Sequence, residues 1–71
     1  MNQETEKRIR KALRKLRSTL TKQGAELGLA LNECEEASDD FELCNDEIYQ
    51  SAVSLWFAVN EAIEKIGKIL K

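Results

Sequence analysis

Eight basic side chains near the N-terminus are the residues of this sequence best suited to binding chemistry. Residues 1–22 hold eight Lys or Arg and two Glu, a net charge of +6. Cations at this density neutralise phosphate groups in RNA, in DNA or on an anionic membrane surface. No aromatic residue stands among them, so the stacking platform of single-strand binders is missing. The candidate nucleic-acid contacts are Arg8, Arg10, Lys11, Arg14, Lys15 and Arg17.

The alternative interpretation of these bases is a solvated face that pairs with acids of the same chain. If the chain folds back on itself, Glu61 and Glu64 fall opposite Arg17 and Arg14, so part of the positive charge would be neutralised internally. We therefore rank nucleic acid below protein as a partner.

The sequence contains few of the residues and motifs that catalysis requires. Histidine is absent, so the sequence offers no imidazole base and no histidine metal ligand. Gly24-x-x-x-Gly28 lacks the Lys-Ser/Thr that follows a phosphate-binding loop. The acids between residues 39 and 47 lack the Asp-x-Asp-x-Asp-Gly order that wraps calcium. We predict no enzymatic activity, no catalytic residue, no cofactor and no metal site.

Two apolar series predict the elements that position these residues. The first is Ile9, Leu13, Leu16, Leu20, Gln23, Leu27, Ala30, Cys34 and Ala37. The second is Ile48, Ala52, Leu55, Val59, Ala62, Ile66 and Ile69. Both step alternately by four and three residues, the spacing that keeps one stripe of an α-helix facing a partner helix.

The two series come into register when the chain folds back between them. The expected pairs are Ile9 with Ile69, Leu16 with Ala62, Leu20 with Val59 and Leu27 with Ala52, whose numbers add to 78 or 79. The sequence thus predicts an all-α fold: a single domain of residues 1–71 forming a long antiparallel helical hairpin. Its helices should span about 3–37 and 40–70, around a turn at 38–40, where Asp39 and Glu42 have the spacing of a capping box.

Gly24 and Gly28 allow a second interpretation of the first helix. Each glycine costs about 1 kcal/mol relative to alanine inside a helix. A break there would give a three-helix bundle of segments 3–22, 25–37 and 40–70. We favour the unbroken helix because the apolar stripe keeps its phase through both glycines.

A second apolar seam on the later helix predicts self-association. It contains Trp56 at its middle and lies on the same side as the two glycines. Soluble monomers rarely expose a contiguous apolar flank of this kind to water. We therefore predict a homodimer that buries it and completes a four-helix bundle. The expected interface is Gly24, Gly28, Leu31, Tyr49, Val53, Trp56, Ile63 and Leu70. Residues 23–64 carry eleven acids and no base, so antiparallel packing would set each basic end beside the partner's acidic turn.

Cys34 and Cys44 are a possible disulfide, because their numbers also add to 78. Their spacing resembles one half of the twin Cys-x9-Cys pattern of mitochondrial intermembrane-space hairpins. Those proteins have four such cysteines and this chain has two, so the family is not carried over. Reduced thiols acting as small apolar fillers are the favoured interpretation for a cytosolic chain.

The N-terminus is charged and lacks the apolar core of a secretory signal, and the longest apolar run is too short for a bilayer. We therefore expect a cytoplasmic protein with no membrane partner. The dimeric hairpin layout resembles that of the plasmid copy-number regulators whose hairpins bind paired RNA loops, although no motif is shared. We expect a small interaction or regulatory protein, of the size common among phage and plasmid accessory proteins, that acts on an unidentified protein. The alternative is an RNA- or DNA-binding regulator that uses the outer face of the first helix.

Overall fold

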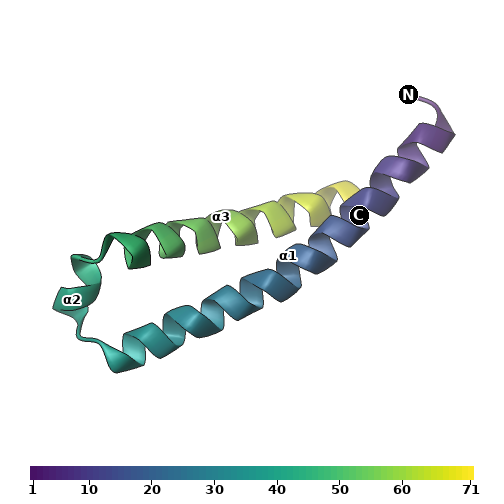
Figure 1. Ribbon diagram of the computed structural model, residues 1–71. Helices are drawn as coiled ribbons and strands as arrows, with labels where there is room; N and C mark the ends of the chain where they lie inside the picture. The colour runs from purple at the N-terminus through teal and green to yellow at the C-terminus, as the bar shows by residue number, and fades with distance from the viewer.

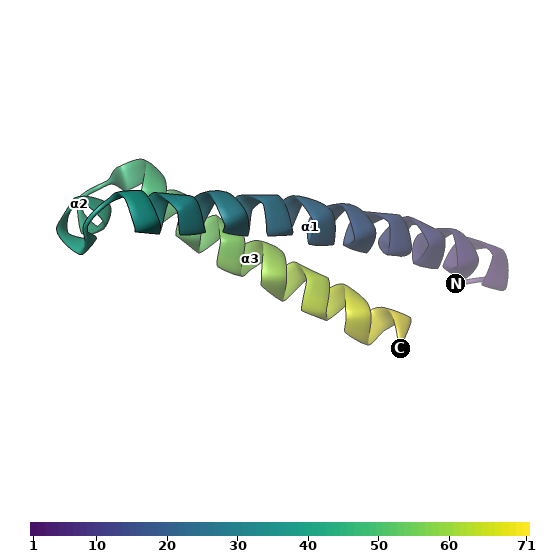
Figure 2. The same cartoon turned by 90° about the horizontal axis from the view of Figure 1, so that it is seen from below.

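The computed structural model describes residues 1–71, apart from the side chain of Asp40. It contains α1 (Gln3–Ala37), α2 (Asp40–Cys44) and α3 (Glu47–Leu70). Figures 1 and 2 show α1 and α3 antiparallel, with α2 at the closed end and both termini toward the open end. The prediction of an all-α fold is confirmed.

The first helix is unbroken. Its 35 residues correspond to about 52 Å at 1.5 Å per residue, and the molecule is 53 Å long. Its first turn is capped by Asn2, whose side-chain oxygen accepts a hydrogen bond from the backbone N–H of Thr5 at 2.8 Å. The interpretation with a break after Gln23 is therefore wrong.

The two glycines in the middle of α1 lie directly against side chains of α3. A Cβ added at Gly28 would lie 2.9 Å from Nε1 of Trp56, and one added at Gly24 would lie 3.2 Å from Cγ1 of Val59. Glycine at these positions lets the large side chains of α3 reach the α1 backbone. This packing offsets the weak helix propensity of the two residues.

The predicted helix over residues 40–70 is wrong, because the structure divides it at Asn45 and Asp46. The predicted cap is present: the Asp39 carboxylate accepts from the backbone N–H of Glu42 at 2.8 Å and starts α2. A second cap follows, in which the Asp46 carboxylate accepts from the N–H of Tyr49 at 2.9 Å and starts α3. An N-cap residue has extended backbone, so this cap ends one helix and begins the next.

The inserted α2 shifts the register between the long helices. Residues in contact across the hairpin include Gly24 with Val59, Gly28 with Trp56, Arg17 with Gly67 and Glu35 with Tyr49. The numbers of each pair add to 83 or 84 rather than the predicted 78 or 79. The predicted pairs are therefore wrong by about five residues, because the connection takes more chain than a tight turn would.

Apolar residues form three rows along α3, and the hairpin covers two of them. In α1 the row of Gly24 and Leu31 is apolar only in the C-terminal half of the helix, because Arg10 and Arg17 occupy its earlier positions. The covered rows, buried or half-buried, are Leu13, Leu20, Leu27, Cys34, Gly24 and Leu31 in α1, with Ala52, Val59, Ile66, Tyr49, Trp56, Ile63 and Leu70 in α3. We call the third row of each helix its outer row. The outer rows are Ile9, Leu16, Gln23, Ala30 and Ala37 in α1, with Ile48, Leu55, Ala62 and Ile69 in α3. All of them are exposed except Ala62, which is half-buried.

The outer rows differ from the prediction, which placed them between the two helices. Their five Ile and Leu side chains are between 41 % and 83 % exposed. In both helices each outer-row position precedes a position of a covered row by four residues. Because α1 and α3 run in opposite directions, both outer rows therefore lie on the same side of the hairpin.

The core of the isolated hairpin is thin. Leu43 and Ile66 are the only buried hydrophobic residues among the described side chains. The accessible surface is 5898 Å², whereas a compact monomer of this mass would expose about 4,500 Å². The radius of gyration is 16.3 Å, against about 11 Å for a compact chain of this length. The single hairpin leaves apolar surface that a compact fold would bury.

Alanine substitution of two glycines is expected to change stability in opposite directions. A Cβ at Gly67 would make an ordinary 3.8 Å contact with Arg17, so Gly67→Ala should raise the free energy of unfolding by about 0.4–1 kcal/mol. Gly28→Ala should lower it by about 1–2 kcal/mol, because the Trp56 ring must shift. The free energy lost to overpacking exceeds the gain in helix propensity from replacing glycine by alanine. Urea denaturation followed by circular dichroism tests both. Equal stabilisation by the two substitutions would contradict the close approach at Gly28.

Candidate functional site

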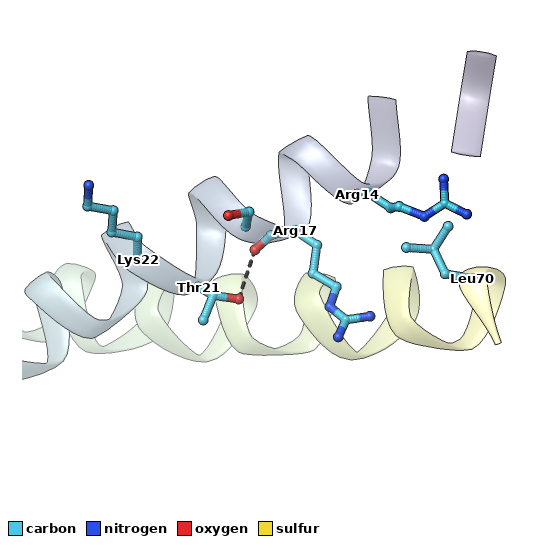
Figure 3. Close-up of a pocket in the computed structure, with 6 residues that line it drawn as sticks. Arg14, Arg17, Thr21, Lys22 and Leu70 are labelled. Carbon is cyan, nitrogen blue, oxygen red and sulfur yellow. Dashed lines mark hydrogen bonds between the residues drawn. The ribbon is translucent and has the colours of Figure 1, made fainter. Parts of the chain in front are cut away.

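A groove with basic walls lies at the open end of the hairpin, where the last turns of α3 lie against α1. Its volume is about 650 Å³. Figure 3 shows the residues that line it, five from α1 and one from α3. They are Arg14, Arg17, Ser18, Thr21, Lys22 and Leu70.

The two arginines extend toward α3 from neighbouring turns of α1. Arg17 reaches across α3 at Gly67, where its guanidinium would lie 3.8 Å from a Cβ added to the glycine. Arg14 extends toward Leu70, and Lys22 points away from both arginines (Figure 3). The Thr21 hydroxyl donates its hydrogen bond to the carbonyl oxygen of Arg17 at 2.8 Å. Thr21 therefore shapes the wall, while the guanidinium groups supply the hydrogen-bond donors.

The arginines of the groove have no acidic partner among the described side chains. Glu61 pairs with Lys65 at 3.2 Å, and Glu64 lies 3.9 Å from Lys68. Both acids thus pair with the base four residues later on their own helix, an arrangement that helix geometry favours. The expectation that Glu61 and Glu64 pair with Arg17 and Arg14 is wrong, and the positive charge of the groove is not neutralised by them.

The other predicted nucleic-acid contacts are spread around α1. Arg10 is half-buried, pairs with Glu6 at 3.3 Å and donates to the carbonyl oxygen of Ile69 at 3.2 Å. It thus closes the C-terminal end of α3, where cationic side chains are favourable. Arg8, Lys11 and Lys15 are exposed. Helical spacing places Arg8 and Lys15 on the side of α1 turned away from α3. The structure brings Arg14 and Arg17 together and gives Arg10 a structural contact.

The predicted dimer-interface residues lie largely inside the hairpin. Gly24 is buried, and the other seven are half-buried where α1 meets α3. Tyr49 ties the two helices, since its hydroxyl donates to a carboxylate oxygen of Glu35 at 2.6 Å. The Trp56 ring packs edge-on against Phe57, with the ring centroids 5.3 Å apart.

A second groove, of about 590 Å³, opens beside Trp56 on the side opposite the outer rows. Leu29 and Phe57 line it and are more than 60 % exposed. Neither residue was predicted on this side from the sequence, because both fall outside the apolar series. A flank with apolar character therefore exists here, but it is shorter than the outer rows.

Cys34 and Cys44 are free thiols in the structure. Cys34 is half-buried in a covered row of α1, whereas Cys44 is exposed in α2. The shifted register sets residues near 50 across from Cys34. The predicted facing of the two cysteines depended on the earlier register, which the inserted α2 changes.

Comparisons with known proteins match no family model, no curated protein and no solved structure. In the described part of the chain, neither long helix has a stretch that is both long and apolar enough to cross a bilayer. The function is therefore argued from the geometry of this chain.

Proposed function

We propose that this protein is a non-enzymatic interaction module that works as a homodimer, in which two hairpins form a four-helix bundle and present charged helix surfaces to another protein. The observation that carries the proposal is the outer row of each long helix, whose Ile and Leu side chains are exposed on one side of the hairpin. In the cytoplasm, the location expected from the sequence, both free thiols would stay reduced.

The number of apolar rows distinguishes half a bundle from a complete hairpin. A helix that packs on one neighbour needs two apolar positions per seven residues, whereas a helix in a bundle core uses three. α3 has three along its length, and α1 has three in its C-terminal half, where the outer-row positions are Ala30 and Ala37. The hairpin covers two of the three. The outer rows are thus placed to face a second pair of helices.

The spacing of the outer rows supports an inverted dimer, in which each helix packs on its own copy. The α1 row then pairs Leu16 with the partner's Ala37 and Gln23 with the partner's Ala30. The α3 row pairs Leu55 with the partner's Ala62 and Ile48 with the partner's Ile69. Three of these four layers set a long side chain against alanine, which lets facing layers interdigitate. Polar Gln23 in such a row would help to fix the register.

Surface area and charge support the same arrangement. The hairpin exposes about 1,400 Å² more than a compact monomer, and a stable interface buries about 800 Å² per partner. Inversion sets the basic residues 7–22 of one hairpin beside the acids of residues 33–47 of the other. A parallel dimer would instead bring the two basic ends together and be opposed by repulsion.

Sedimentation equilibrium tests the dimer, and cysteine crosslinking tests its direction. We expect a dimer at micromolar concentration. In a Cys34→Ser, Cys44→Ser background, Gln23→Cys with Ala30→Cys should form covalent dimers on oxidation. The two new thiols lie about 10 Å apart on one helix, too far for a bridge within the chain. A folded monomer at all concentrations would overturn the proposal, and a dimer that does not crosslink would overturn the inverted arrangement.

A second candidate function is nucleic-acid binding, and the unpaired arginines of the basic groove favour it. Of the eight bases in residues 7–22, only Arg10 forms an ion pair with a described side chain. The remaining charge would attract phosphate without reading sequence, so binding should weaken steeply with salt. Fluorescence anisotropy with unrelated RNA and DNA duplexes tests this function. Tight binding to a single sequence at physiological salt would show a specificity that this geometry does not provide.

A further inference from the structure

We propose that the groove between α1 and α3 at the open end binds backbone phosphates of a nucleic acid, with Arg14 and Arg17 as the principal contacts. The proposal rests on the second candidate function and deepens it. It assigns binding to one side of α1, whereas the sequence assigned it to the whole outer face of this helix.

The chemistry of the two arginines fits a phosphodiester. A guanidinium presents its N–H donors in a planar fork that can bind two oxygens of one phosphate. Both side chains are exposed, and neither pairs with a described carboxylate. The Ser18 hydroxyl lies on the same groove wall and can act as a further donor. The site therefore combines unneutralised charge with directional donors.

A basic stripe continues the groove along the free part of α1. Lys7 and Lys11 precede Arg14 by seven and three residues, so helical spacing places them on the same side of α1. Both are exposed. In Figures 1 and 2, α1 extends beyond the end of α3, so the N-terminal part of this stripe lies where α1 has no neighbouring helix. From Lys7 to Arg14 the helix rises about 10 Å, close to the axial length of three nucleotides in one strand.

The groove stays open in the proposed dimer. The outer rows lie on the side of the hairpin opposite the groove, so the partner's acidic turn would approach the other side of α1. Each dimer would then carry two grooves, one at each end. Regularly spaced phosphates suit such a linear stripe better than the irregular carboxylates of an acidic protein, which is why we assign a nucleic acid.

A pair of matched double variants tests the proposal on the full chain. Arg14→Gln with Arg17→Gln removes two charges from the groove. Arg8→Gln with Lys15→Gln removes two charges from the side of α1 that faces away from α3. We expect the groove variant to lose at least tenfold more affinity for a labelled DNA or RNA duplex at about 50 mM salt. Its salt-dependence slope should fall by about 1.8, the value for two lost phosphate contacts.

The outcomes separate this proposal from the function on which it rests. Equal losses in the two variants would overturn the groove while leaving nucleic-acid binding in place. No binding by the wild-type protein at low salt would overturn both. Displacement of the duplex by polyglutamate at equal charge concentration would indicate an acidic protein ligand and would also overturn the proposal. Because all four substituted residues are exposed, both variants should keep the circular dichroism spectrum of the wild type.

Discussion

Leu55→Glu is expected to convert the proposed dimer into folded monomers and to raise its dissociation constant about a thousandfold. Leu55 lies near the middle of the α3 outer row and is 59 % exposed in the single hairpin. Burial of a leucine side chain contributes about 2 kcal/mol, and a two-fold dimer contains the residue twice. The loss of about 4 kcal/mol corresponds to three factors of ten in the dissociation constant.

Leu29→Glu is the matched control for this prediction. Leu29 is 62 % exposed, slightly more than Leu55 at 59 %, but it lines the groove beside Trp56 on the other side of the hairpin. Sedimentation equilibrium of both variants therefore compares the two flanks. If Leu55→Glu stays dimeric and Leu29→Glu is monomeric, the dimer interface lies on the Trp56 flank, and its assignment to the outer rows is wrong.

The periodicity of the sequence determined the elements but could not choose among three apolar rows. Leu13, Leu20 and Leu27 were correctly assigned to the hairpin contact, whereas Leu16 and Leu55 were not. The choice depends on where Trp56 packs, and a ring of that size needs the open backbone at Gly28. The glycine was visible in the sequence, but its pairing with Trp56 required the correct register.

The register itself depended on one weak local signal. Asp46 caps α3 without the Glu or Gln three residues later that completes a capping box, since Tyr49 occupies that position. The preceding Asn45, a poor helix former, was the available sign of a break. Because α2 was not predicted, the predicted contacts between α1 and α3 were shifted by about five residues. The same error led to the prediction that Glu64 and Glu61 neutralise Arg14 and Arg17. The four-residue spacing of Glu61 and Lys65 could have indicated that these two residues pair with each other instead.

The assignment of Ile66 to a covered row also predicts a large effect on stability. Ile66→Ala should strongly lower the free energy of unfolding. Ile66 is 6 % exposed and belongs to a covered row of α3. Truncation of a buried isoleucine costs about 2–5 kcal/mol, because transfer energy is lost and a cavity is left. A chain of this size has a total stability of about 4–11 kcal/mol, so a large part of it would disappear. Since each kcal/mol shifts the melting temperature of such a domain by about 4–8 °C, a drop of 10 °C or more is expected.

Ile69→Ala provides the matched comparison when both substitutions are made in the Leu55→Glu monomer. Ile69 lies in the outer row and is 54 % exposed. The change in helix propensity is the same for Ile66→Ala and Ile69→Ala. Beyond that change, truncation of Ile69 in a monomer should lower the free energy of unfolding by well under 1 kcal/mol. In the proposed wild-type dimer both truncations should be costly, because the partner would cover Ile69. Urea denaturation at one protein concentration measures all four variants. Equal costs for Ile66 and Ile69 in the monomer would show that the hairpin buries different rows, and the proposed interface would lose its basis.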